Sequence, residues 1–247
     1  MKNNLIQELY KLIHQKMTLY GAICLLLLMN YVAITNSNTK SIISQGFGSG
    51  QWITIIVITI SSNFLAMEYR DNTIITLMYK NRNKWQIYFS KFVVLILYTL
   101  FLVILGFVFT LIIKVLIIGN RYSWDQQTLL IELLLNMLGT VIYSFFIISL
   151  ELLLISFVKV NAAVIGIGLA IGFFGASISN VLLSVFSNLN RIIAWNPLNM
   201  INIMNQLSHP NYSQFTKLTN NQFVIGNIIY TTLFLAIGYF IFKKRRV

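Results

Sequence analysis

The 247-residue chain is 57% hydrophobic and only 10% charged, whereas soluble domains carry about 25% charged residues. Its net charge of +12 does not call for a nucleic-acid partner, because membrane proteins concentrate Lys and Arg in cytoplasmic loops. A single cysteine excludes an intrachain disulfide framework. We therefore expect an all-α membrane protein that crosses the bilayer several times.

Residues 1–17 predict an amphipathic helix that lies in the inner membrane interface. Its apolar residues recur at helical spacing: Leu5, Leu9, Leu12 and Ile13. The polar residues Glu8, Lys11 and Gln15 occupy other faces, and the lysines would lie near anionic headgroups. A solvated cytoplasmic tail is the alternative.

Six apolar segments follow, each long enough to cross a hydrocarbon core about 30 Å thick. Their approximate bounds are 18–35, 51–67, 89–118, 128–158, 162–187 and 222–242. Residues 36–50 are rich in Ser, Asn and Gly and predict a flexible polar loop. In the long polar segment 188–221, Pro197 favours a helix start, which predicts a short re-entrant or surface helix. The whole chain 1–247 is expected to form one transmembrane domain.

The orientation follows from the distribution of basic residues between the two sides. Thirteen Lys and Arg residues fall on the side of the N-terminus and five on the other side. The positive-inside rule therefore predicts that both termini are cytoplasmic and that the loops at 36–50 and 188–221 lie outside the cell.

The stretch between the second and third spans concentrates charge and amphipathicity. Glu68, Arg70 and Asp71 lie within four positions of one another. Asp71 and Thr73 are both suitable N-caps for a helix of about two turns. This helix would lie on the cytoplasmic surface and present an apolar docking face to another protein: Ile74, Leu77, Met78 and Tyr79.

Charged residues inside the spans are functional candidates, because their burial in a bilayer is costly. Lys114 and Glu132 are expected at matching depth near the outer ends of adjacent spans, which predicts an ion pair, with separate snorkelling as the alternative. Glu151 would lie roughly 10 Å from the inner end, where it lines a cavity, packs or snorkels. An ion- or proton-coupled secondary transporter that uses Glu132 or Glu151 is therefore one functional hypothesis.

The fifth span carries small residues at four-residue spacing, namely Gly168, Gly172 and Ala176. Such spacing lets helix backbones approach closely, either within one subunit or between subunits. The glycines of 46–50 do not match a phosphate-binding loop. His14 and His209 are expected on opposite sides of the membrane, so they cannot share a metal. We expect no catalytic residue, metal site or bound cofactor in this chain.

The pattern Glu68-x-Arg70-x-x-Thr73, followed by an apolar helix and basic residues after the second of six spans, resembles the permease subunits of type-2 ABC transporters. In that family an acidic-Arg-Gly-Thr signature opens the coupling helix, which docks into a cleft of the ATP-binding subunit. Asn72 stands in place of the usual glycine, and Asn also tolerates the left-handed conformation.

Two further segments support this resemblance. Residues 1–17 are similar to the family's connecting helix, and Trp195-Asn196-Pro197-Leu198 before the last span is similar to its extracellular re-entrant helices. The resemblance implies that the chain is not an enzyme. It implies a permease half that pairs with a second copy or a paralogue and with two ATP-binding subunits, which hold the ATP and Mg.

In its short length and its lack of a large extracellular domain, the chain resembles the Gram-positive subunits for bacteriocin immunity or for export of amphipathic toxins such as phenol-soluble modulins. This subgroup implies an exporter of amphipathic or hydrophobic peptides in the bacterial plasma membrane. A predominantly apolar interior, without the charged ladder expected for ion or sugar transport, agrees with such a substrate.

Overall fold

The fold is helical throughout the part of the chain that can be described. The structure is a computed structural model, and it describes residues 2–36, 39–71, 73, 83–119, 122, 124 and 128–244. Six helices are long and apolar enough to cross a membrane: α2 (Lys16–Asn36), α4 (Ser49–Arg70), α6 (Lys84–Ile113), α7 (Leu129–Val158), α8 (Asn161–Val185) and α12 (Asn220–Lys244). The predicted all-α membrane fold with six spans is therefore confirmed.

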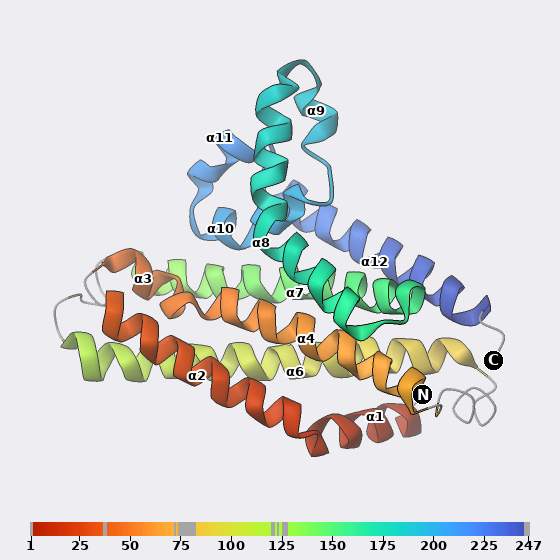
Figure 1. The fold of residues 1–247 in the computed structure, drawn as a ribbon. Coiled ribbons are helices and arrows are strands. Elements are labelled where there is room, and N and C mark those ends of the chain that lie inside the picture. Colours follow the sequence, from red (N-terminus) through yellow and green to blue (C-terminus); the bar gives the residue numbers. More distant parts are fainter. Residues whose placement is uncertain are drawn as a thin grey trace.

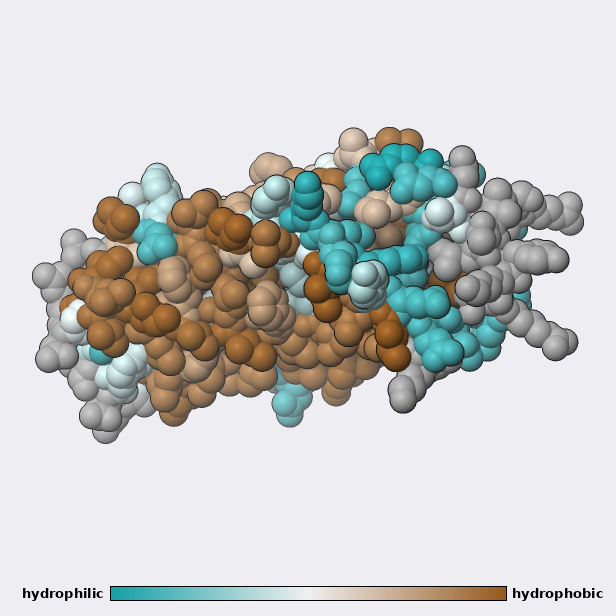
Figure 2. Space-filling view, turned by 90° about the horizontal axis from the view of Figure 1, so that it is seen from below, coloured by the Kyte–Doolittle hydropathy of each residue, from teal (hydrophilic) through white to brown (hydrophobic). Residues whose placement is uncertain are grey.

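The long helices are arranged around α4 and α7. In Figure 1, α2, α4, α6 and α7 extend along the same long dimension of the molecule, and α4 is the most enclosed of the six spans. The second half of α8 leaves the bundle and projects away from it. Figure 2 shows hydrophobic side chains across the middle of one face and hydrophilic side chains toward one end. Outward-facing apolar side chains in such a belt are suited to lipid contact.

One end of the bundle gathers the basic residues, and we call it the basic end. It contains α1 (Lys2–His14), the last turn of α4, the start of α6, the junction of α7 with α8 and the end of α12. The described basic residues of this end are Lys2, Lys11, Lys16, Arg70, Lys84, Lys91, Lys159, Lys243 and Lys244. The third span begins at Lys84, five residues before its predicted start.

The prediction of a flexible polar loop is wrong for residues 39–50. This segment forms α3 (Lys40–Ser44) and the short helix η1 (Gly46–Gly48) before α4 begins. Gly46 and Gly48 adopt φ angles of 58° and 74°, and Phe47 adopts 52°. The two glycines carry no Cβ, so they permit this tight reversal, which buries the Phe47 ring in the bundle.

The connection from α8 to α12 consists of short helices: η4 (Ser187–Leu189), α9 (Asn190–Ile193), η5 (Asn199–Asn202), α10 (Ile203–Ser208), η6 (Pro210–Tyr212) and α11 (Ser213–Thr216). At Gly139 of α7, a Cβ would come within 2.8 Å of the Met204 Cα atom, so the backbone of α10 packs directly on α7. Gly139 lies ten residues into α7, roughly 15 Å along its axis. The α8–α12 connection therefore folds back along the side of α7, and whether it is re-entrant stays a prediction.

Several buried polar side chains of the α8–α12 connection find their partners within it. The Asn199 side chain donates to the carbonyl oxygens of Ala194 (2.7 Å) and Thr216 (3.0 Å). The Gln206 amide donates to the Leu218 carbonyl at 2.7 Å. Non-helical backbone is tolerated at membrane depth only when the protein supplies such partners.

Candidate functional site

Four charged side chains meet at the basic end, where α1, α4 and α6 come together. Lys91 of α6 lies 2.8 Å from Glu8 Oε2 of α1 and 3.1 Å from Glu68 Oε1 of α4, measured from its Nζ atom. Lys11 of α1 lies 2.8 Å from the same Glu68 oxygen and 3.5 Å from Glu8 Oε1. We call these four residues the charge cluster. It contains two acids and two bases, so it is neutral as a unit.

The charge cluster is largely shielded from solvent. The Lys91 side chain is only 1% exposed, and its Nζ atom lies 4.6 Å from the centre of the Phe64 ring, which adds a cation–π contact. Buried charges are tolerated when each has a well-placed partner, and removing one partner leaves another charge uncompensated. The cluster therefore holds α1, α4 and α6 together as one unit.

Lys11 is the most exposed member of the cluster. Its partial burial disfavours the ammonium form, but the hydrogen bond to Glu68 and the negative charges of Glu8 and Glu68 outweigh that effect. The pKa of Lys11 is therefore raised above its ordinary value, so this side chain stays charged throughout the physiological pH range.

Glu68 also connects the cluster to the segment that follows α4. Thr73 Oγ1 donates to Glu68 Oε2 at 2.5 Å, so each carboxylate oxygen of Glu68 has a partner. Arg70 and Asp71 pair with each other on the exposed surface, with 3.1 Å between Nε and Oδ1. Asn72 and the predicted docking residues lie outside the described residues, and their role stays a prediction: Ile74, Leu77, Met78 and Tyr79.

Three members of the charge cluster, Glu8, Lys11 and Lys91, were not among the site residues expected from sequence. On α1, Ile13 is 64% exposed in the chain, whereas Glu8, which the sequence placed on a polar face, is buried beside the bundle. Glu8 is three residues after Leu5 and four before Leu12, so helical spacing places it in the same stripe as these two leucines. That spacing was the available signal.

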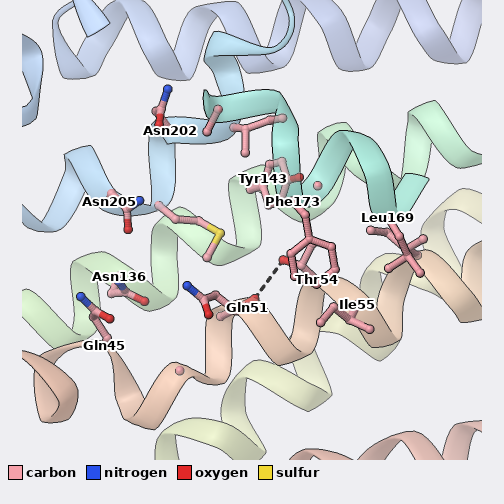
Figure 3. Close-up of a pocket in the computed structure, with 17 residues that line it drawn as sticks. Gln45, Gln51, Thr54, Ile55, Asn136, Tyr143, Leu169, Phe173, Asn202 and Asn205 are labelled. Atoms are coloured by element: carbon pink, nitrogen blue, oxygen red, sulfur yellow. Dashed lines mark hydrogen bonds between the residues drawn. The ribbon is translucent and has the colours of Figure 1, made fainter. Parts of the chain in front are cut away.

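A second feature is a cavity of about 280 Å³ between α4, α7, α8 and the α8–α12 connection, in the half of the bundle opposite the basic end. Amide side chains gather on one side of it, and apolar side chains of α4 and α8 lie on the other (Figure 3). The polar group is Gln45, Gln51, Asn136, Asn202 and Asn205. The apolar group includes Ile55, Leu169 and Phe173. Ile58 of α4 also lines the cavity. The cavity is therefore amphipathic.

The predicted ion pair between Lys114 and Glu132 does not form in the structure. Lys114 begins a π-helical segment, η2 (Lys114–Ile118), and its Nζ atom lies 4.8 Å from the centre of the Trp124 ring. Within the part of the chain that the structure describes, Lys114 has no carboxylate within 4.0 Å. A cation–π contact with the aromatic ring therefore takes the place of the expected pair.

Glu151 and the small residues of α8 lie together. The Glu151 side chain is fully buried in the chain, so it does not snorkel, and it packs where Gly168 leaves room on α8. Gly172 lies near Ile58 of α4 and Tyr143 of α7, and Ala176 lines the cavity. The small-residue face of α8 thus packs against α4 and α7 within one chain.

A comparison with protein families returns a match described as "ABC-2 family transporter protein", over residues 5–176. No curated protein matches the sequence. The matched segment runs from α1 into α8, and it includes the charge cluster and Glu151. Since it covers well over half of the 247 residues, the chain belongs to the ABC-2 family of transporter proteins, as a membrane component that associates with an ATP-binding subunit.

Proposed function

We propose that this chain is the permease half of an exporter that moves amphipathic or hydrophobic peptides out of a Gram-positive cell. It pairs with a second permease copy or a paralogue and with two ATP-binding subunits, which hold the ATP and Mg. Both termini and the basic end face the cytoplasm, in line with the positive-inside rule. Family membership favours this ATP-driven mechanism over the ion-coupled alternative.

The observation that carries the proposal is the path of α4. Its last turn holds Glu68, at the root of the proposed coupling segment 73–79, and its first half lines the amphipathic cavity with Gln51, Thr54 and Ile55. Thr54 and Glu68 are fourteen residues apart, roughly 21 Å along one helix. A displacement at the coupling segment is therefore delivered to the cavity by a single rigid element.

The charge cluster couples this movement of α4 to two further helices, α1 and α6. Because Glu68 is bonded to Lys11 and Lys91, a shift of the coupling segment carries α1 and α6 with the end of α4. ATP-driven closure of the partner subunits then changes the packing of three elements together. Packed helices move between discrete arrangements and do not deform continuously, which suits alternating access.

The cavity supports an amphipathic substrate. Its volume, about 280 Å³, is near the lower end of ligand pockets, so it suits a few side chains of a peptide at one time. The amide groups on one side offer hydrogen bonds to peptide backbone or polar side chains. The apolar group on the other side takes aliphatic or aromatic side chains.

The test uses Leu77→Asp in the proposed coupling segment. An aspartate in the docking face is expected to uncouple the permease from its ATP-binding subunits. Amphipathic peptide then no longer stimulates the ATPase of the co-purified complex, and export falls at least tenfold. The measurements are peptide-stimulated ATPase in proteoliposomes and peptide export in the same vesicles.

The matched control is Tyr212→Asp, which introduces the same charge at an exposed aromatic residue in the α8–α12 connection. It should leave both activities unchanged. Normal transport by Leu77→Asp would refute the coupling role. Failure of any chain with a phosphate-binding loop to co-purify with this one would refute the exporter.

A further inference from the structure

Glu151 is the one acidic side chain in the described part of the chain that is both fully buried and unpaired. It is 0% exposed, and neither of its carboxylate oxygens has a hydrogen-bond partner. No Lys, Arg or His within the described residues comes within 4.0 Å of it. The hydroxyl of Tyr143, also buried on α7, has no partner either.

The surroundings of Glu151 place it beside the amphipathic cavity. A Cβ atom at Gly168 would overlap the carboxylate, and the same position lies 2.9 Å from both the Glu151 Cδ atom and the Ile58 Cγ2 atom. Ile58 and Leu169, the residue after Gly168, both line the cavity. Tyr143 lines it as well, about two turns along α7 from Glu151. The carboxylate is therefore separated from the apolar side of the cavity by one layer of side chains.

Packing alone does not account for an acidic residue at this position. An ionised carboxylate without a partner is costly to bury, and a protonated one still has a hydroxyl donor that needs an acceptor. A leucine or methionine would fill the same space without that cost. A cation or a strong hydrogen-bond donor from outside the described chain would supply the missing partner.

We propose that Glu151 binds an ammonium or guanidinium group of the transported molecule, while the adjoining cavity takes its apolar side chains. The proposal rests on the export function above and specifies its substrate as a cationic amphipathic peptide. Access requires a displacement of α8, which meets the carboxylate at Gly168, where α8 carries no side chain. Such a displacement separates Gly168 from Glu151 and Ile58, whereas more than half of the α8 side chains are exposed in the chain.

The experiment compares two probes on the co-purified complex in nanodiscs of zwitterionic phosphatidylcholine. One probe is an amphipathic Leu/Lys peptide, and the other is the same peptide with every lysine Nε-acetylated. The wild-type complex should bind the lysine peptide about tenfold more tightly than the acetylated peptide. Glu151→Gln should remove that preference and leave the affinity for the acetylated peptide unchanged.

Two further variants keep the test decisive. Glu132→Gln changes the other carboxylate of α7, which is partly exposed, and it should keep the full preference. Glu151→Asp keeps the charge and should retain part of the preference, whether or not Glu151→Gln folds. Equal binding of both probes by the wild type, or an unchanged preference in Glu151→Gln, would overturn the site alone. If neither probe binds or stimulates ATPase, the peptide-export function itself fails.

Discussion

Glu68 and Glu151 are both buried carboxylates in membrane-spanning helices, and their surroundings differ completely. Glu68 bonds to two lysines and a threonine drawn from α1, α6 and the segment after α4. Glu151 lies against Gly168 and Ile58 and has no hydrogen-bond partner for either oxygen within the described chain. The same chemical group is fully satisfied at the basic end and unsatisfied in the bundle.

This difference indicates two separate tasks. A buried charge whose partners all come from the chain is a permanent joint, because breaking it exposes the others to an uncompensated charge. A buried charge without an internal partner lowers the stability of the resting state, and such a residue is retained where binding supplies the missing contact. Substitutions at the two sites should therefore change stability in opposite directions.

The largest effect is expected for Lys91→Met in the charge cluster. Methionine fills the volume of the lysine stem, but Glu8 then loses its 2.8 Å partner and faces Glu68 with only Lys11 to neutralise both. The free energy of unfolding should fall by about 3–5 kcal/mol. Reversible unfolding in mixed detergent micelles measures this loss.

The control for that experiment is Lys84→Met at the start of the same helix. Lys84 makes only a long, exposed hydrogen bond of 3.4 Å to the Lys243 carbonyl, so the variant should unfold within about 0.5 kcal/mol of wild type. Equal losses in the free energy of unfolding for the two variants would mean that the buried ion pairs of the charge cluster do not hold α1, α4 and α6 together.

Glu151→Met is expected to act in the opposite direction and by a smaller amount. It removes a buried group that lacks any hydrogen-bond partner and replaces it with an apolar side chain of similar length. The free energy of unfolding of the ligand-free protein should rise by about 1–3 kcal/mol. The same micelle assay measures it. A loss as large as that of Lys91→Met would show that Glu151 is a structural joint like Glu68.

The six spans could be predicted from sequence because hydropathy over some twenty residues is a local property that any bilayer imposes. The ion-pair partners of the charged side chains could not be predicted in this way, because they depend on which helix faces meet. Glu68 was identified as a candidate from its neighbours in sequence, but its lysine partners lie 57 and 23 residues away. The Lys114–Glu132 pair failed for the same reason, since equal depth does not make two helices present the same faces.

The segment 39–50 shows a second limit of composition. Its serines and glycines are typical of an exposed loop, yet two positive-φ glycines bury Phe47. A local count of polar residues does not detect one aromatic side chain that turns inward, because the stabilisation comes from the bundle it enters. The short helices after Pro197 were accessible to prediction, since proline restricts the backbone locally.

The smallest effect tests how tightly α8 covers Glu151. Gly168→Ala adds a Cβ that overlaps the carboxylate, so strain outweighs the gain in helix propensity and stability should fall by about 1 kcal/mol. Gly166→Ala, on the same helix with no atom within 4 Å, should be neutral or slightly stabilising. In a Glu151→Ala background the cost of Gly168→Ala should disappear, because the two residues then no longer compete for space. A cost that persists in the double variant would mean that Gly168 is required for the approach of α4, through Ile58, and that the carboxylate is not held beneath α8.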